Sequence, residues 1–142
     1  MKKINDIFAC KALFFIMAFS IGLWTIRIPT IRDQIQTDYL GIGYIMATFA
    51  IGSIIMMLCA NYFISKSSSK KIIIYIVIAQ WLLWLPVPFI KDLLTFMILA
   101  FMFGFCFGLF EICINLKASK IESREGKSMM SGFHAFWSLG VL

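Results

Sequence analysis

The chain has 142 residues, of which 61% are hydrophobic and only 14% are charged, and its formal net charge is +6. A soluble globular domain is about half apolar and about one quarter charged. The composition therefore excludes a soluble domain and predicts an integral membrane protein surrounded by a lipid bilayer. Because the basic residues lie in short connections between apolar runs, their charge is expected to report orientation, and no nucleic-acid partner is expected.

The first apolar run follows a basic N-terminus that resembles a signal peptide. No small-residue cleavage site closes the run, so an uncleaved membrane-spanning helix is expected from about Lys11 to Ile28. Pro29 is expected to end or kink this helix, and residues 29–38 are expected to form a polar connection. A second span is predicted from Leu40 to Ile64, where small residues on one side favour packing against other helices.

The polar patch Ser65–Lys71 is expected to be a loop before a third span, Ile72–Ile90. Two residues separate that span from a fourth, Leu93–Leu116, so the two spans are expected to form a tight antiparallel hairpin. Residues 117–128 are expected to form a charged loop. The last segment, 129–142, has 14 residues, whereas about 20 are needed to cross a bilayer. The sequence therefore predicts an all-α membrane protein with four transmembrane helices and a truncated fifth.

The lysines and arginines are divided unequally between the two sets of connections. Ten are expected on one side of the membrane: Lys2, Lys3, Lys11, Lys66, Lys70, Lys71, Lys117, Lys120, Arg124 and Lys127. Three are expected on the other side: Arg27, Arg32 and Lys91. Basic residues in short loops favour the cytoplasmic side, so the N-terminus is predicted to be cytoplasmic.

Four residues of the fourth span are predicted to share one helix face: Gly104, Gly108, Glu111 and Asn115. At about 100° per residue they point within roughly 60° of one another. The two glycines are expected to serve helix packing, because small residues let a second backbone approach closely. An ionised acid at the bilayer centre costs about 2.5–3.5 kcal/mol, so Glu111 is expected to face protein and to be protonated, paired or hydrated.

Five residues are predicted to contribute to a substrate or proton pathway: Glu111, Asn115, Arg27, Trp24 and His134. Each also has a structural interpretation that stays open. Glu111 could extend to the headgroups, and Asn115 could hydrogen-bond a neighbouring helix. Arg27, on one face with Trp24, could bind a ligand or anchor the helix at the interface. His134 could relay protons or serve packing and capping.

The sequence contains no arrangement that predicts catalysis. The four cysteines, at positions 10, 59, 106 and 113, lie in apolar runs without accompanying histidines, so no metal site is expected. A histidine cluster, a Ser–His pairing and a phosphate-cradling glycine loop are all absent from the sequence. We therefore expect no enzyme activity and no cofactor.

Three sequence strings carry a family resemblance: WTIRIP at residues 24–29, GFCFGLFEICIN at 104–115 and SGFHAFWSLG at 131–140. Together with the helix lengths and loop charges, they resemble the start of a major facilitator superfamily transporter, in a bacterial branch with sugar and fucose permeases. That family folds as twelve helices in two six-helix halves and binds substrate between them. The resemblance implies that this chain is an N-terminal part, about one third, whose missing helices are lost or come from a second chain.

The resemblance also suggests roles for individual residues. Glu111 matches a fourth-helix acid associated with proton coupling in the fucose-permease-like branch. The acid that some of those symporters carry in the first helix is replaced here by Thr25. The family's basic loop motif is also eroded, with Asn61, Ser65 and Ser68 where a glycine, an aspartate and a second glycine are expected.

The leading hypothesis is a secondary transporter of the bacterial inner membrane that moves a small solute, with proton coupling at Glu111. One alternative is a small multidrug-type exporter that works as a dimer of four-helix subunits. Such exporters carry their essential acid in the first helix, whereas here it is in the fourth. A second alternative is a structural subunit of a membrane complex.

Overall fold

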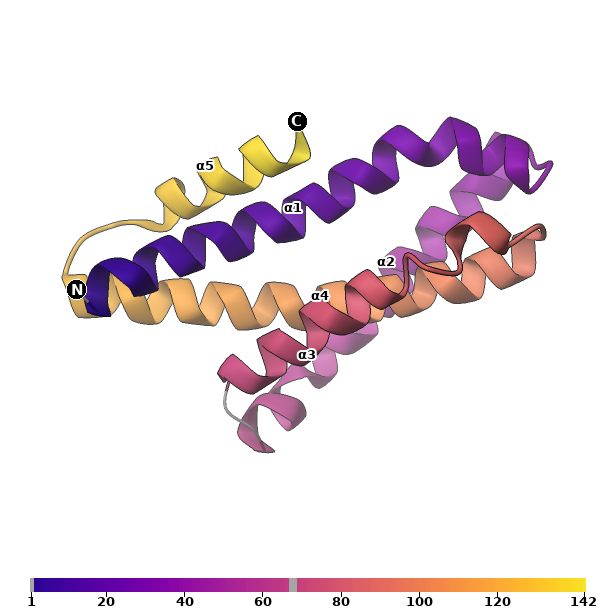
Figure 1. The fold of residues 1–142 in the computed structure, drawn as a ribbon. Coiled ribbons are helices and arrows are strands. Elements are labelled where there is room, and N and C mark those ends of the chain that lie inside the picture. The colour runs from indigo at the N-terminus through magenta and orange to yellow at the C-terminus, as the bar shows by residue number, and fades with distance from the viewer. Residues whose placement is uncertain (1, 67–68) are drawn as a thin grey trace. The chain divides into compact units, whose positions relative to one another are not determined.

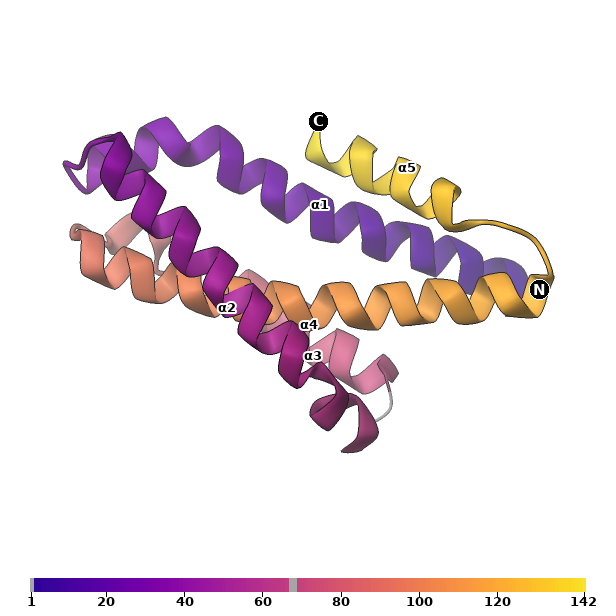
Figure 2. The same ribbon diagram turned by 180° about the vertical axis from the view of Figure 1, so that it is seen from behind.

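The computed structural model describes residues 2–66 and 69–142, and every regular element in these ranges is helical (Figure 1). The elements are α1 (Lys2–Gln34), α2 (Tyr39–Lys66), α3 (Ser69–Leu82), the short 3-10 helix η1 (Val87–Phe89), α4 (Leu93–Glu125) and α5 (Met130–Val141). Figure 2 shows the same helices from behind. The all-α fold class is confirmed.

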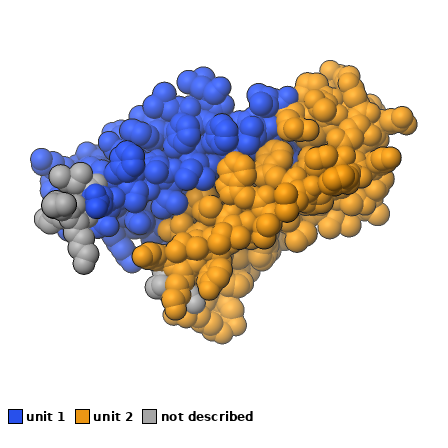
Figure 3. Space-filling model, in the orientation of Figure 1, with its two compact units in different colours: residues 1–26, 113–142 blue, residues 27–112 orange. Residues whose placement is uncertain are grey.

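The described residues contain four segments that are long and apolar enough to cross a membrane: Asn5–Gln34, Tyr39–Lys66, Lys70–Phe89 and Leu93–Glu125. These segments overlap the four predicted spans. The chain divides into two compact units, which Figure 3 distinguishes by colour. Unit 1 contains residues 1–26 and 113–142, and unit 2 contains residues 27–112, so both α1 and α4 contribute to each unit.

The first helix is longer than the sequence predicted, because α1 continues through Pro29 to Gln34. Proline removes one backbone donor from a helix but does not force it to end. Ile31, two residues after Pro29, is 2% exposed, so the continued part of the helix is packed against other residues. The helix ends where Gln36 adopts a left-handed φ of 51°. The predicted polar connection is therefore reduced to residues 35–38.

The polar patch Ser65–Lys71 is not a loop over most of its length. Ser65 and Lys66 form the last turn of α2, α3 begins at Ser69, and residues 67 and 68 lie outside the described part of the chain. Local side-chain contacts support the last turn of α2. The Ser65 hydroxyl donates to the carbonyl of Tyr62 over 2.9 Å, and the Lys66 ammonium donates to the Tyr62 hydroxyl over 2.6 Å.

The third span is interrupted, since α3 ends at Leu82 and not at the predicted Ile90. Pro86 and Pro88 lack the backbone donors that an α-helix needs at these positions, and the chain forms turns and then η1. Gln34 holds this irregular segment. Its side-chain amide donates to the carbonyls of Val87 and Ile90, over 2.8 and 2.6 Å.

The fourth helix extends nine residues beyond the predicted end at Leu116, because α4 continues to Glu125. The charged loop predicted for residues 117–128 is therefore mostly helix, and only residues 126–129 connect α4 to α5. Ala118 and Ile121 are almost completely buried and continue the apolar face of the helix at a spacing of three residues. Gly126, with a φ of 63°, ends the helix in a left-handed conformation that glycine adopts without strain.

In unit 2, α2 and α4 approach each other through their glycines. A Cβ atom on Gly104 would collide with the carbonyl oxygen of Phe49, and one on Gly108 would collide with that of Ser53. Gly52 on α2 is placed in the same way against the α4 backbone at Phe101. The two helix backbones are therefore in direct contact, which is the arrangement that small residues permit in membranes.

In unit 1, α5 lies along the N-terminal part of α1 in both ribbon views (Figures 1 and 2). The completely buried rings of Phe14 and Phe133 stack with their centroids 5.7 Å apart. Glycines bring the rest of α5 close to α1. A Cβ atom on Gly22 would lie 2.8 Å from the carbonyl oxygen of Val141, and one on Gly140 would collide with the backbone of Phe15.

Candidate substrate and proton pathway

Glu111 lies in the apolar part of α4, one turn after Gly108, and its side chain is partly buried. The preceding glycines contact the backbone of α2, so this face of α4 is directed at protein as far as Gly108. Glu111 continues the same face by helical spacing. A carboxylate in this position can bind and release a proton or accept hydrogen bonds from a polar solute.

Three predicted pathway residues belong to unit 1 and lie on three different helices. Trp24 on α1 is 6% exposed, Asn115 on α4 is partly buried, and His134 on α5 is exposed. The imidazole ring of His134 packs edge-on against Phe14, with centroids 5.3 Å apart. His134 therefore contacts the α1–α5 interface from its exposed border.

Arg27, the first basic residue after the three N-terminal lysines, is exposed and is the first residue of α1 that belongs to unit 2. Glu111 also belongs to unit 2, at the opposite end of that unit's sequence range. The predicted residues are therefore divided between the two units, two in unit 2 and three in unit 1. A single pathway through all five residues stays a prediction.

Unit 1 also contains an open groove of about 370 Å³ between α1 and α5, lined by Phe8, Ala12, Phe15, Ile16 and Phe136. Its lining is apolar throughout, although the Lys11 ammonium lies 4.9 Å from the centre of the Phe136 ring. A solute site needs a few polar groups that orient the ligand. This groove therefore does not have the chemistry of a site for a polar substrate.

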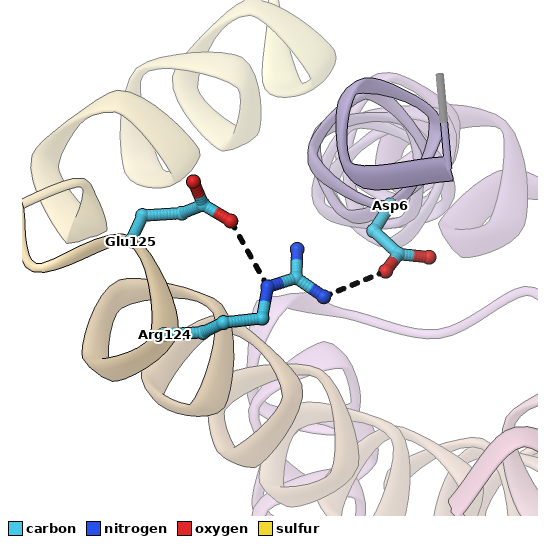
Figure 4. A network of polar contacts seen from close by, with 3 residues as sticks. All are labelled: Asp6, Arg124 and Glu125. Atoms are coloured by element: carbon cyan, nitrogen blue, oxygen red, sulfur yellow. Dashed lines mark hydrogen bonds and ion pairs between the residues drawn. The ribbon is translucent and has the colours of Figure 1, made fainter.

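Sequence reasoning missed a polar network at the end of α4, because it assigned these residues to a loop. Arg124 donates from Nη1 to a carboxylate oxygen of Asp6 and from Nε to one of Glu125, both over 2.9 Å (Figure 4). Glu122 accepts hydrogen bonds from the backbone of the next helix. The apolar spacing of Ala118 and Ile121 is the sequence signal that could have extended the helix and located these residues.

The described residues offer no cluster of three or more histidine, cysteine, aspartate or glutamate side chains that could hold a metal ion. All four cysteines are free thiols. The predicted pathway residues carry a carboxylate and an amide on α4, an imidazole on α5, and a guanidinium and an indole ring on α1.

Comparison with known proteins identifies the family. Residues 10–142 match the sequence profile of the Major Facilitator Superfamily. This chain belongs to the Major Facilitator Superfamily. It is 26% identical over 133 residues to an uncharacterized MFS-type transporter of Yersinia pestis, which covers 92% of this chain and 34% of that relative. It is 22% identical over 129 residues to the uncharacterized transporter y4wD of Sinorhizobium fredii, covering 91% of this chain and 34% of the relative.

A third relative is the membrane protein MosC of Rhizobium meliloti, 23% identical over 134 residues, which are 91% of this chain and 32% of MosC. No solved structure matches the chain. The chain thus spans about one third of the length of the curated relatives it matches. Membership in the superfamily and the four apolar segments make it an integral membrane protein.

Proposed function

We propose that this chain forms the first helices of a secondary transporter that moves a small solute across the bacterial inner membrane. The observation that carries the proposal is the superfamily match, which extends over residues 10–142. Two of the relatives are named as transporters. The same match favours transport over enzyme catalysis, over a small multidrug-type dimer and over a purely structural subunit.

Glu111 is the proton-responsive group in this proposal. Its support is the position of the carboxylate within an apolar helix, where an ionised acid costs about 2.5–3.5 kcal/mol unless it is compensated. Because of this free-energy cost, the protonation state of Glu111 depends on the polar groups or water molecules beside its carboxyl group. A solute that hydrogen-bonds to Glu111 can therefore change its protonation, which is the linkage that coupled transport requires.

The substrate class in this proposal is a sugar or a similarly polar small molecule. Its support is the sequence resemblance of the strings at 24–29, 104–115 and 131–140 to the sugar and fucose permease branch. Trp24 and Asn115 have the chemistry for such a ligand, because an indole ring covers the apolar face of a sugar and an amide pairs with its hydroxyl groups. Thr25 stands where some of those symporters carry a first-helix acid, so the chain departs from their pattern at this position.

The N-terminus is cytoplasmic in this proposal, as the ten-to-three distribution of basic residues favours. Because the chain spans about one third of its relatives, further helices complete the transporter. They supply the second wall of the substrate site. The lipid bilayer is the other partner.

Uptake assays test this function. The chain is expressed in bacterial cells alone and together with the remaining two thirds of a full-length relative, and uptake of labelled sugars is measured between pH 5.5 and 8. Uptake is expected only with the complementing segment. Glu111→Gln should abolish the pH dependence. Glu125→Gln, which removes a carboxylate from the last turn of the same helix, should retain it. Unchanged pH dependence in Glu111→Gln would remove the proton role, while absent uptake in every combination would contradict transport.

A further inference from the structure

The first turn of α5 has no capping side chain of its own. Its N-cap residue is Met129, with φ −129° and ψ −9°, and no side chain at this position accepts from the helix. The first backbone N–H groups of a helix have no partner within the helix. A helix that begins with methionines therefore needs an acceptor from elsewhere.

Glu122 supplies that acceptor from the end of α4. Its Oε2 atom accepts the backbone N–H of Met129 over 2.7 Å and that of Met130 over 2.8 Å. Hydrogen bonds to a charged acceptor are shorter and stronger than neutral ones, and a carboxylate is favoured at a helix N-terminus by the helix dipole. Glu122 thus performs for α5 the role that Ser, Thr, Asp or Asn performs at most helix starts.

Arg124, two residues later, reaches a different helix. It binds Asp6 near the start of α1 and also its neighbour Glu125 (Figure 4). All of these residues belong to unit 1. The last turn of α4 therefore contacts the starts of both α1 and α5, through groups of opposite charge.

We propose that the last turn of α4 is a two-armed ionic clasp, in which Glu122 holds the start of α5 and Arg124 holds the start of α1. The clasp ties the start of α5 and the start of α1 separately to the end of α4. Gly126 and the short connector 126–129 do not themselves hold the start of α5, and the contacts farther along α5, at Phe133 and Gly140, are made to α1 and not to α4. Glu122 is a positioning residue, and it also sets the position of His134 one turn into α5.

The two arms differ in strength. The Asp6 and Arg124 side chains are 45% and 39% exposed, and exposed ion pairs contribute little to stability. Glu122 makes two charge-assisted bonds to backbone groups that have no other partner in the helix, and loss of such bonds costs more. The Glu122 arm is therefore the dominant one.

Amide hydrogen exchange of the whole 142-residue chain in lipid nanodiscs tests the clasp. Glu122→Ala should accelerate exchange of the Met129 and Met130 amides at least about tenfold, with residues 5–9 of α1 unchanged. Asp6→Asn should accelerate exchange of residues 5–9 by no more than about fivefold, with Met129 and Met130 unchanged. Glu125→Gln is the matched control, because it removes the same charge one turn from Glu122. It should leave the amide exchange rates of Met129 and Met130 unchanged.

A second variant distinguishes loss of the Glu122 hydrogen bonds from general misfolding of the protein. Glu122→Gln keeps the shape and one oxygen acceptor but removes the charge, so it should give an intermediate acceleration at Met129 and Met130. The protection of α2, in unit 2, should be the same in all variants. The clasp is wrong if neither Glu122 variant accelerates the two amides, or if Glu125→Gln accelerates them as much. Neither result depends on transport activity, so the clasp and the proposed function fail independently.

Discussion

At the scale of single residues, three glycines determine how close α2 and α4 lie. Lipid is as apolar as leucine, so helices in a membrane associate through close packing and not through exclusion of water. Gly52, Gly104 and Gly108 each face the backbone of the opposite helix, with no room for a methyl group. The spacing of Gly104 and Gly108 indicated this packing from the sequence, but the partner helix could not be inferred from spacing alone.

Gly104→Ala should therefore destabilise the protein. The added Cβ collides with the Phe49 carbonyl, and overpacking of this kind costs about 1–3 kcal/mol. Gly43→Ala is the matched control, since a Cβ at Gly43 meets nothing within 4 Å; it should be neutral or stabilise by up to about 1 kcal/mol through helix propensity. Unfolding of both variants in detergent measures the difference. Equal stability of the two would contradict direct contact between α2 and α4.

The capping role of Glu122 could not be predicted from the sequence. A capping residue is usually recognised immediately before its helix, but Glu122 is seven residues before Met129. Its role depends on the turn at Gly126, which brings the chain back toward the end of α4. Only the folded connection shows that a residue inside one helix caps the next.

At the scale of elements, helix ends differ most from the predicted spans. The apolar runs predicted where the spans lie, because length and hydropathy are properties of contiguous sequence. The ends of α1 and α4 lie beyond the apolar runs, where buried residues such as Ile31 and Ile121 decide whether the helix continues. The end of α3 is set by two prolines and by the hydrogen bonds from Gln34.

The start of α4 carries a cap that makes its stability depend on pH. Asp92 accepts the backbone N–H of Thr95 over 2.8 Å, and hydrogen bonds from Thr95, first from its backbone and then from its side chain, lower the pKa of the Asp92 carboxyl. A carboxyl with a lowered pKa in the folded state stabilises the protein above its unfolded pKa, about 3.9. This stabilisation is lost as the pH falls through the lower folded value.

Asp92→Asn should therefore show less loss of helix than the unchanged protein when the pH is lowered from 5 to 2. Circular dichroism in detergent measures this difference. Asp33→Asn serves as control, because it removes an exposed carboxylate paired only with its neighbour Arg32. If Asp33→Asn protects as well as Asp92→Asn does, the acid sensitivity does not originate at the start of α4.

At the scale of the whole molecule, the distribution of basic residues predicts the orientation of every connection. Reporters fused after Gln36 and after Lys91 should be active outside the cytoplasm, and a reporter fused after Gly126 should be active inside it. Alkaline phosphatase is the reporter for locations outside the cytoplasm, and green fluorescent protein is the reporter for locations inside it. Replacing Lys117, Lys120 and Lys127 by glutamine should lower the fraction of the reporter after Gly126 that lies in the cytoplasm. A reporter after Gly126 that is active outside would contradict the cytoplasmic N-terminus.

Membrane residence, the helical class and the approximate location of each span follow from composition and from the length of apolar runs. A bilayer imposes its thickness and its lack of hydrogen-bonding partners on any chain that crosses it, so these features can be predicted without a fold. The tertiary structure decided which glycines contact which helix backbone and whether α1 continues past Pro29. It also decided how Glu122 and Arg124 connect the end of α4 to α5 and α1. Each of these depends on atoms that are distant in sequence, and their distances exist only once the helices have packed.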